Sequence, residues 1–490
     1  MGGSRSSLLS KLPDGLWARA AQFLVLLLLG YFIATWPLTL ATSLVCGGIV
    51  FFLLFLYPQY GVVLLAFAVP FGSLKQVHVG SIALGATEVL LALMIASWLA
   101  HMLAFGRVSF GRPPLVLPLL GFVAAGLVSL MGATSLSLSV VEIIKWVELL
   151  AIYLFVVHYL EGRESQILVL ALIIAGAAEA LLGVYQFLFQ VGPPGFVLFG
   201  RFMRAWGTFG QPNPFGGYLG LTLPLALGIV MTNWNSWRIG EHEARWQRLM
   251  CWVVALVGTG LMGLAMIMSW SRGAWMGFAG AFVVMSVARG WRWVARLLLI
   301  AAVAVSLLIA ADLLHLIPSS IFQRLGDLTV YLEGVDLRSV EITDENWAVM
   351  ERLAHWQAAS DMLESHPWTG VGMGNYALVY PEYALSRWQD PLGHAHNYYL
   401  HVGAEAGLVG LLAYVVLVVA WLRYAWRGAT RARGYWQGVT LGVLGVLTHL
   451  TIHNLFDNLY VHGMYIQVGM MLGLLCVAVR QAAASECMGQ

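Results

Sequence analysis

Long apolar segments recur along most of the chain, and no other feature of the sequence constrains the fold as strongly. Most of them approach the roughly 20 residues that an α-helix needs to cross a bilayer. They run at about 16–36, 38–57, 59–72, 82–105, 114–131, 141–160, 166–190, 214–232, 249–268, 274–290, 293–313, 397–424, 436–456 and 463–482. Because one segment is short for a span, we predict an all-α polytopic membrane protein with about 12–14 transmembrane helices.

The composition excludes an ordinary soluble protein. Of the 490 residues, 60% are hydrophobic and 10% are charged, whereas a soluble domain carries about 25% charged residues. The net charge of +2 gives no indication of a nucleic-acid partner. Cys46, Cys251 and Cys476 lie in apolar runs and Cys487 lies in the tail, so no disulfide framework is predicted. We interpret the first apolar run as an uncleaved helix, because no cleavage signal follows it.

The basic residues are distributed unevenly between alternate connections, and this predicts the orientation in the membrane. If the N-terminus is cytoplasmic, most of the 26 lysines and arginines fall in cytoplasmic connections. The short outer connections then hold only Lys75, Arg201, Arg204 and Arg272. Basic residues favour the cytoplasmic side. We therefore expect a multi-pass protein of the inner (cytoplasmic) membrane with both termini in the cytoplasm.

One long connection, residues 314–396, contains no spanning run and is acidic. The same charge count places this loop on the outer side of the membrane. The loop therefore divides the chain into three predicted parts. Residues 1–313 form the first set of transmembrane helices, 314–396 form a large extracytoplasmic loop, and 397–490 form the last helices and a short cytoplasmic tail.

Within this loop, Asn346–Ser365 has the apolar spacing of an amphipathic helix. His366-Pro367 follows and is expected to end the helix, because proline disfavours helical geometry in the residue before it. Gly370, Gly372 and Gly374 come next and predict a flexible turn.

Two arginines on the predicted outer side are candidates for binding an anion. Arg272 lies in a tight turn between two apolar runs, although an arginine that snorkels to the membrane interface is the simpler alternative. Arg352 lies on the amphipathic helix four residues before Trp356, where a solvated ion pair with Glu351 or Glu345 is the simpler alternative. Two guanidinium groups on one side of the membrane can grip a diphosphate, because they stay charged and donate in pairs.

Three histidines, His394, His396 and His401, stand at the entry to the span at 397–424. A histidine of near-neutral pKa can take a proton from a hydroxyl group. His-x-His is also a plausible pair of metal ligands, and interfacial packing is a third interpretation. The residues alone leave these three open.

A further polar set lies at the end of the span at 436–456. His449, His453 and Asp457 are spaced i, i+4, i+8, so they share one helical face. The carboxylate could orient a catalytic histidine or accept a ligand hydroxyl, and a purely structural face is equally consistent. Arg201 and Arg204 line another outer connection, where they add positive charge near the same site or contact lipid headgroups.

The sequence around these residues resembles the O-antigen ligase superfamily. This superfamily includes O-antigen ligases, O-antigen polymerases, bacterial O-linked oligosaccharyltransferases and cyanobacterial proteins once labelled bicarbonate transporters. The resemblance covers roughly residues 200–460. It is carried by His396-Asn397 followed after nine residues by Gly407-Leu408-Val409-Gly410, by His366-Pro367-Trp368-Thr369-Gly370-Val371-Gly372, by Ser271-Arg272-Gly273-Ala274-Trp275, and by Gly207-Thr208-Phe209 with Pro212-Asn213-Pro214.

The resemblance implies a GT-C-like, metal-independent, inverting glycosyltransferase that uses no cofactor and works on the outer face of the membrane. Its donor would be a glycan on undecaprenyl diphosphate, and its acceptor a hydroxyl group of lipid A core, a glycan or a protein. His396 would be the base, and Arg272 and Arg352 would bind the diphosphate. The remaining residues expected to bind substrate are Arg204, Arg201, Asn213, Asn397, Trp356, Asp457 and His394.

A membrane transporter or permease is the alternative function, because some relatives were once assigned to that class. A transporter places polar or broken helices near the middle of the membrane. The chain has few charges in mid-span, and its polar residues gather at the predicted outer face, which favours the enzyme. The main mid-span charges are Glu88, Glu142, Lys145, Glu148 and Glu179.

Overall fold

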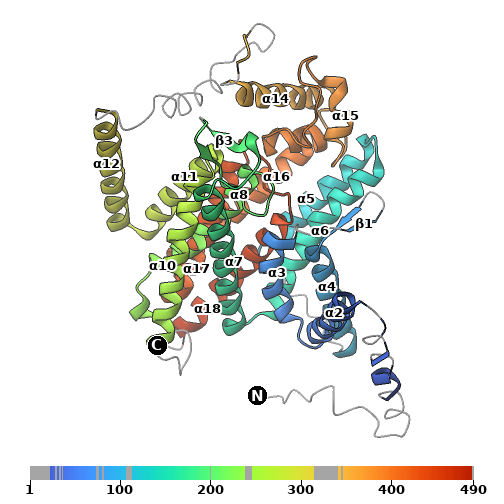
Figure 1. Ribbon diagram of the computed structural model, residues 1–490, viewed down its shortest axis with the longest axis vertical. Helices are drawn as coiled ribbons and strands as arrows, with labels where there is room; N and C mark the ends of the chain where they lie inside the picture. The colour runs from blue at the N-terminus through green and yellow to red at the C-terminus, as the bar shows by residue number, and fades with distance from the viewer. Residues whose placement is uncertain are drawn as a thin grey trace. The chain divides into compact units, whose positions relative to one another are not determined.

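The computed structural model describes residues 23–27, 30–31, 35, 37–72, 77–79, 82–105, 113–198, 200–237, 245–313, 340–343 and 346–487. The chain divides into two compact units, Met1–Pro58 and Gln59–Gln490 (Figure 1). In the first unit, α2 (Leu38–Leu56) matches the predicted second apolar segment and ends where the Tyr57 amide donates to the Leu53 carbonyl. The predicted segment at 16–36 lies largely outside the described residues.

The second unit is built almost entirely of helices in its described parts. They are α3 (Gln59–Phe71), α4 (Ala86–Phe105), α5 (Val116–Ser129), α6 (Leu136–Tyr159), α7 (Gly162–Leu188), α8 (Pro212–Gly220), α9 (Leu223–Val230), α10 (Arg245–Met268), α11 (Arg272–Arg289), α12 (Trp291–Leu313), α14 (Trp347–Ser365), α15 (Tyr376–Tyr383), α16 (Tyr398–Arg431), α17 (Gly434–His453) and α18 (Met464–Cys487). Short 3-10 turns lie at Leu130–Gly132, Pro194–Phe196 and Trp234–Ser236.

Two short antiparallel hairpins interrupt the helices. One pairs β1 (Val77–Val79) with β2 (Ile82–Leu84), in the register Val77 opposite Leu84. The other pairs β3 (Val197–Leu198) with β4 (Phe202–Met203). The second hairpin leads into the Gly207-Thr208-Phe209 segment, so it lies close to the residues that the sequence marked as functional.

The prediction of an all-α polytopic membrane protein is confirmed. Among the described residues, six helices are long and apolar enough to cross a membrane, and α8 and α9 count as one of them. The amphipathic helix predicted at Asn346–Ser365 is α14, and it ends at His366 as expected. The total of 12–14 spans stays a prediction, since several matching helices are short or carry charges. The six spans are Ala86–Ala104, Gly162–Leu188, Pro212–Val230, Arg245–Met268, Tyr398–Arg431 and Met464–Ala484.

Helix α17 lies at the centre of the second unit, where it packs against α9, α11, α16 and α18. Glycines allow the close approach to α9. A Cβ atom on Gly228 would lie 2.4 Å from the Gly438 carbonyl oxygen and 2.5 Å from the Gly442 nitrogen. Helices inside a membrane gain little from hydrophobic association, and small residues that let backbones touch supply packing energy instead.

The span formed by α8 and α9 is broken at Leu221-Thr222, ahead of Pro224. A break exposes backbone groups that find no water in a bilayer. Gln467 of α18 meets this need, because its side-chain amide donates to the Leu221 carbonyl at 3.2 Å and to the Thr222 hydroxyl at 2.8 Å. The break between α8 and α9 is therefore stabilised by hydrogen bonds from a neighbouring helix.

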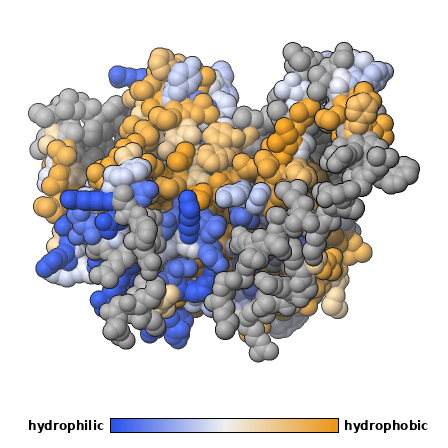
Figure 2. Space-filling view, turned by 90° about the horizontal axis from the view of Figure 1, so that it is seen from below, coloured by the Kyte–Doolittle hydropathy of each residue, from blue (hydrophilic) through white to orange (hydrophobic). Residues whose placement is uncertain are grey.

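Helices α14 and α15 lie at the end of the bundle where α16 begins (Figure 1). Arginines gather at the other ends of the helices: Arg289 lies in the last turn of α11 and Arg431 in the last turn of α16. Arg480 of α18 donates to the carbonyls of Val157 and Leu160. Figure 2, seen from below, shows hydrophilic side chains gathered over part of the lower face with apolar side chains around them. Which face of the bundle is cytoplasmic stays a prediction.

Replacing Gly228 by Ala should destabilise the bundle, because the new Cβ would strike only backbone atoms of α17, which have little room to move. Overpacking of this kind costs about 1–3 kcal/mol, so the unfolding temperature in detergent should fall. Gly260→Ala in α10 is the matched control, since nothing lies within 4 Å of the added methyl group. Equal unfolding temperatures for the two variants would contradict the proposed contact.

Candidate active site

A cavity of about 320 Å³ lies where the start of α8, the start of α11, helix α14 and the α17–α18 connection meet. Sequence positions far apart converge there, because each comes from the end of an element or from α14. Among the residues that the sequence marked, those lining this cavity are Arg204, Asn213, Arg272, Arg352, His394, His396, His453 and Asp457. We call it the arginine lobe.

Three arginines give the arginine lobe its positive character. Arg272 is the first residue of α11, and Ser271 is its N-cap. The N-terminal end of α11 therefore opens onto the same cavity as the Arg272 side chain. A helix N-terminus presents backbone N–H groups and a partial positive charge, which adds to the attraction for an anion. Arg352 of α14 lines the cavity from another element.

Arg204 ties the lining elements together. Its Nε donates to the Ser269 carbonyl at 2.9 Å, and its Nη2 donates to Asn213 Oδ1 at 2.9 Å. These bonds link the turn before Arg272 to the first turn of α8. Trp270 within this turn has a positive φ of 54°, an unfavourable geometry for a bulky residue that needs support from its surroundings.

The Gly207-Thr208-Phe209 segment is held by polar side chains of α7. Glu179 accepts hydrogen bonds from the Thr208 amide at 2.6 Å and from the Thr208 hydroxyl, and Gln186 accepts from the Gly207 amide at 2.7 Å. A Cβ on Gly207 would lie 1.9 Å from Glu179 Oε1. Only glycine fits there, and the segment is fixed just ahead of Asn213.

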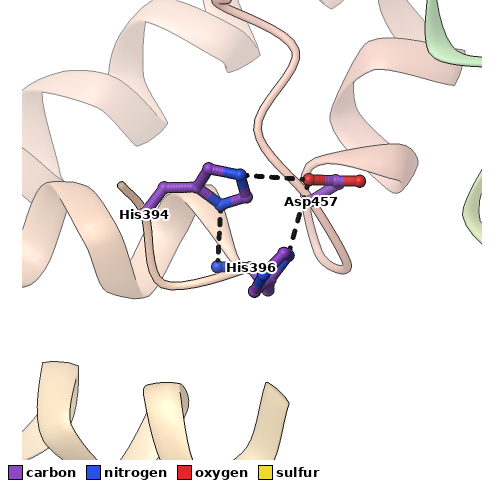
Figure 3. A group of neighbouring side chains, drawn as sticks. All are labelled: His394, His396 and Asp457. Atoms are coloured by element: carbon purple, nitrogen blue, oxygen red, sulfur yellow. Dashed lines mark hydrogen bonds and ion pairs between the residues drawn. The ribbon is translucent and has the colours of Figure 1, made fainter. Parts of the chain in front are cut away.

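His394, His396 and Asp457 form a compact group between the loop before α16 and the α17–α18 connection (Figure 3). His394 Nε2 lies 3.6 Å and His396 Nδ1 lies 3.7 Å from the same oxygen of Asp457. Burial by itself would raise the pKa of Asp457, but the interactions with His396 and His394 lower it well below its ordinary value. Asp457 is therefore an anion at neutral pH.

The proton positions on His394 follow from its hydrogen bonds. The His396 backbone N–H donates to His394 Nδ1 at 3.1 Å, so this nitrogen carries no proton. Burial and the neighbouring His396 lower the pKa of His394 to about 3, and the neutral ring then carries its proton on Nε2, facing Asp457. Two histidines and a carboxylate can hold a divalent cation, but in this tautomer the Nε2 lone pair of His394 is not available to a metal.

His396 has a strained backbone that neighbouring residues hold in place. Its φ is 52°, and such conformations in residues other than glycine often mark functional sites. The indole N–H of Trp356 donates to the His396 carbonyl at 3.3 Å. Behind the ring lies His355, at 5.7 Å between ring centroids, itself stacked on Tyr380. The backbone and one side of the His396 ring are thus fixed.

A second cavity of about 530 Å³ adjoins the first. Both are lined by His394, His396 and Asp457, so these residues form the boundary between them. On the far side of that boundary the second cavity is lined by Glu142, Lys145 and Glu405, and by no arginine among the described residues. We call it the acidic lobe.

The glycine half of the His-Asn-x9-Gly signature makes a docking point for the loop. Helix α16 is broken at Gly407, whose φ is 64°. The Leu408 amide donates to the Pro367 carbonyl at 2.7 Å, and the Val371 amide donates to the Ala404 carbonyl at 2.9 Å. A Cβ on Gly407 would lie 2.4 Å from the Trp368 backbone, so the loop and the helix touch through their main chains.

The predicted flexible turn at Gly370, Gly372 and Gly374 is instead closely packed. All three glycines have positive φ values of 63°, 94° and 75°. A Cβ on Gly370 would lie 2.3 Å from the Glu405 carbonyl carbon, and one on Gly372 would lie 2.5 Å from Ala133. The glycines are needed for backbone geometry and close contact, and the sequence pattern alone did not distinguish this from flexibility.

Three predicted substrate-binding residues do not line the arginine or acidic lobe. Arg201 is exposed on the β3–β4 turn over the Phe202 ring. Asn397 is the N-cap of α16, where its side chain accepts from the amides of Tyr399 and Leu400. Trp356 holds the His396 carbonyl. Asn397 and Trp356 therefore position His396 from outside the two cavities.

Sequence reasoning gave no substrate-binding role to Gln211 and Glu351, and it marked His453 without choosing a role for it, although all three line the arginine lobe. The spacing of His449, His453 and Asp457 was a signal for His453. His355, which lies behind His396, gave no signal, because its position on α14 resembles any buried position of an amphipathic helix.

The fold and the site define a polytopic membrane protein with a cationic and imidazole-containing cavity at one end of its bundle. Residues 257–415 match the family model described as O-Antigen ligase, which supports the O-antigen ligase superfamily for this part of the chain. The match includes Arg272, Arg352, His396 and Gly407, and it places the chain among ligase- or glycosyltransferase-type enzymes with glycan and lipid-linked substrates. No curated protein matches the chain.

Replacing Gly407 by Ala should detach the loop from α16 and lower the unfolding temperature in detergent. Gly407 has φ 64° and ψ −166°, a region essentially restricted to glycine, so the substitution adds backbone strain of about 1–3 kcal/mol. It also adds a methyl group 2.4 Å from the Trp368 backbone. Gly403→Ala, one turn earlier in α16, is the control, because its added methyl group meets only the flexible Leu363 and Leu411 side chains. A Gly407→Ala variant as stable as the control would rule out the docking point.

Proposed function

We propose that this protein transfers a glycan from undecaprenyl diphosphate to an acceptor hydroxyl group, with inversion at the anomeric carbon. The observation that carries the proposal is the convergence of Arg272, Arg352 and the N-terminus of α11 on one cavity that His396 and Asp457 also line. The arginines suit an anionic leaving group, and the histidine suits the removal of a proton.

The diphosphate of the donor binds in the arginine lobe. Arg272 and Arg352 donate paired hydrogen bonds to phosphate oxygens, and the first amides of α11 add further donors. When the bond between the anomeric carbon and the diphosphate oxygen breaks, negative charge grows on that oxygen. Fixed positive groups stabilise this charge, and such stabilisation is often the largest contribution to catalysis. Arg204 supports the site by holding the turn before Arg272.

His396 is the base. Its Nδ1 faces Asp457 at 3.7 Å, which leaves Nε2 to take the proton of the acceptor hydroxyl. The oxygen then attacks the anomeric carbon from the face opposite the diphosphate, so the configuration inverts. Asp457 stabilises the imidazolium that forms, as a carboxylate beside a catalytic histidine does. His394 is a poor base, because its Nδ1 accepts the His396 amide.

The acceptor enters through the acidic lobe, which shares the His396 boundary with the arginine lobe. This arrangement puts donor and acceptor on opposite sides of the base, as an inverting displacement requires. The acidic lobe has no arginine in its lining and its one lysine, Lys145, is paired with Glu142, so it offers phosphate fewer cationic donors than the arginine lobe does.

The reaction as proposed uses no metal ion and takes place on the outer face of the inner membrane. The absence of a metal ion from the reaction is supported by the tautomer of His394, whose proton lies on Nε2 because its Nδ1 accepts the His396 amide. The arginine-rich helix ends on the side away from α14 support the location on the outer face, because basic residues favour the cytoplasm.

A transporter remains the alternative class, but the mid-span charges that it would use have structural partners. Glu179 holds Thr208, Glu148 accepts from the Tyr465 hydroxyl at 2.6 Å, and Glu142 pairs with Lys145 at 2.5 Å. Carboxylates that already bond to neighbouring protein groups are poorly placed to bind a transported substrate. The enzyme proposal explains more of the polar residues.

The variant His396→Ala should lose turnover by on the order of 10²–10⁴-fold, because it removes the general base. The measurement is release of undecaprenyl diphosphate by purified protein given a lipid-linked glycan and an acceptor in the presence of EDTA. His158→Ala is the control, because this histidine of α6 bonds the Leu154 carbonyl and lines neither lobe. Full turnover by His396→Ala would overturn the mechanism, and dependence on added metal would overturn its metal independence.

The variants Arg272→Ala and Arg352→Ala should each weaken donor affinity by roughly 10–100-fold, the effect of losing a hydrogen bond to a charged group. Arg201→Ala is the matched control, since this arginine is exposed and lines neither lobe. Donor affinity is measured by titration of the purified protein. Unchanged affinity in both arginine variants would mean that the diphosphate binds elsewhere.

A further inference from the structure

We propose that His453 is an additional ligand of the donor diphosphate, and that it acts as a neutral N–H donor whose proton position is set by His449. The proposal rests on the proposed function, because it assumes that the arginine lobe binds a diphosphate. It assigns a chemical role to the pair of histidines that the mechanism above does not use.

The two histidines are hydrogen-bonded to each other inside the bundle. His453 Nδ1 lies 3.2 Å from His449 Nε2, and both residues are almost fully buried. A hydrogen bond between two imidazole nitrogens needs one protonated and one bare nitrogen, so the two rings cannot both donate at this contact. His449 lies deeper, and its other nitrogen, Nδ1, is buried without a hydrogen-bond partner.

Two proton arrangements are compatible with this bond. In one, His449 donates from Nε2, His453 Nδ1 is bare, and the proton of His453 is on Nε2. In the other, His453 donates from Nδ1, its Nε2 is bare, and His449 Nδ1 carries a buried N–H without an acceptor. Buried N–H groups without an acceptor are rarer than buried acceptors without a donor, so the first arrangement is favoured. An anion in the arginine lobe favours this first arrangement further, because the anion can accept a hydrogen bond from the proton on His453 Nε2.

The position of His453 lets its Nε2 reach that anion. His453 lines the arginine lobe together with Arg272 and Gly273. A Cβ on Gly273 would lie 3.0 Å from His453 Cδ2 and 3.1 Å from its Nε2. The Nε2 edge of the ring therefore faces the first turn of α11, beside Arg272, where the phosphates are proposed to bind.

Glycines of two helices make room for the pair of rings. On α11, a Cβ on Gly277 would lie 2.8 Å from His449 Nδ1. On α8, a Cβ on Gly220 would lie 1.9 Å from the His449 ring. The glycine of the Ser271-Arg272-Gly273 turn thus has a defined structural role, because it lets the ring edge of His453 lie against the start of α11. A pair of rings this closely confined keeps one orientation, which suits a fixed hydrogen-bond donor.

Two conservative variants separate this role from simple packing. The amide nitrogen of glutamine reaches the place of histidine Nε2, whereas that of asparagine reaches only the place of Nδ1. His453→Gln should keep affinity for farnesyl diphosphate within about threefold, and His453→Asn should lower it about tenfold, the effect of losing a hydrogen bond to a charged group. Affinity is measured by isothermal titration of purified protein in detergent, with EDTA present, and the unfolding temperature of each variant is recorded.

The possible outcomes separate the two proposals. If wild-type protein does not bind farnesyl diphosphate, or if Arg272→Ala binds it equally well, the proposed diphosphate site is wrong. If binding depends on Arg272 but His453→Asn binds like the wild type, or His453→Gln loses as much as His453→Asn, the role of His453 is wrong and the function stands. Should both variants fail to fold, wild-type protein labelled with ¹⁵N-histidine gives a second readout. Adding farnesyl diphosphate should then shift the NMR signal of a histidine ring that is protonated on Nε2 and bare on Nδ1. If no such signal shifts, the proposed role of His453 is wrong.

Discussion

In a bilayer, a backbone N–H or carbonyl that leaves a regular helix must find its hydrogen-bond partner within the protein. The second unit of this chain departs from regular helix wherever it builds its site, and each departure has a partner. Gln467 bonds the break between α8 and α9, Gln186 and Glu179 hold the segment at Gly207, and the broken α16 bonds the loop backbone at Pro367 and Val371. The irregular segments are therefore fixed supports for the residues that we propose to be catalytic.

This requirement also explains the form of the site. Arg272 begins α11, His396 directly precedes the N-cap of α16, and Asp457 follows the end of α17. Side chains at helix ends converge because the ends of packed helices meet at one side of the bundle. One oxygen of Asp457 lies 3.6 Å from His394 Nε2 and 3.7 Å from His396 Nδ1, and the arginines line the same cavity. The same arrangement separates a cationic lobe, which we propose for the leaving group, from a second lobe, which we propose for the acceptor.

The sequence predicted the helices of the second unit well, because apolar runs of about 20 residues have few alternatives in a membrane. It also marked Arg272, Arg352, His396 and Asp457, which line one cavity. It did not show that the side chains of Asn397 and Trp356 form hydrogen bonds with the backbone beside His396. It also mistook the packed turn at Gly370 for a flexible one. A glycine that allows motion and a glycine that allows close contact look alike in a sequence.

What the sequence by itself determined is the membrane location, the class of fold, the expected orientation and the identity of the charged groups at helix ends. These follow from local composition and periodicity, which act within one segment at a time. The tertiary structure decided which nitrogen of His394 carries the proton, that His453 faces the start of α11, and that two lobes meet at His396. Those features depend on contacts between residues far apart in the chain, and hydrogen bonds and close backbone approaches exist only once the helices are packed.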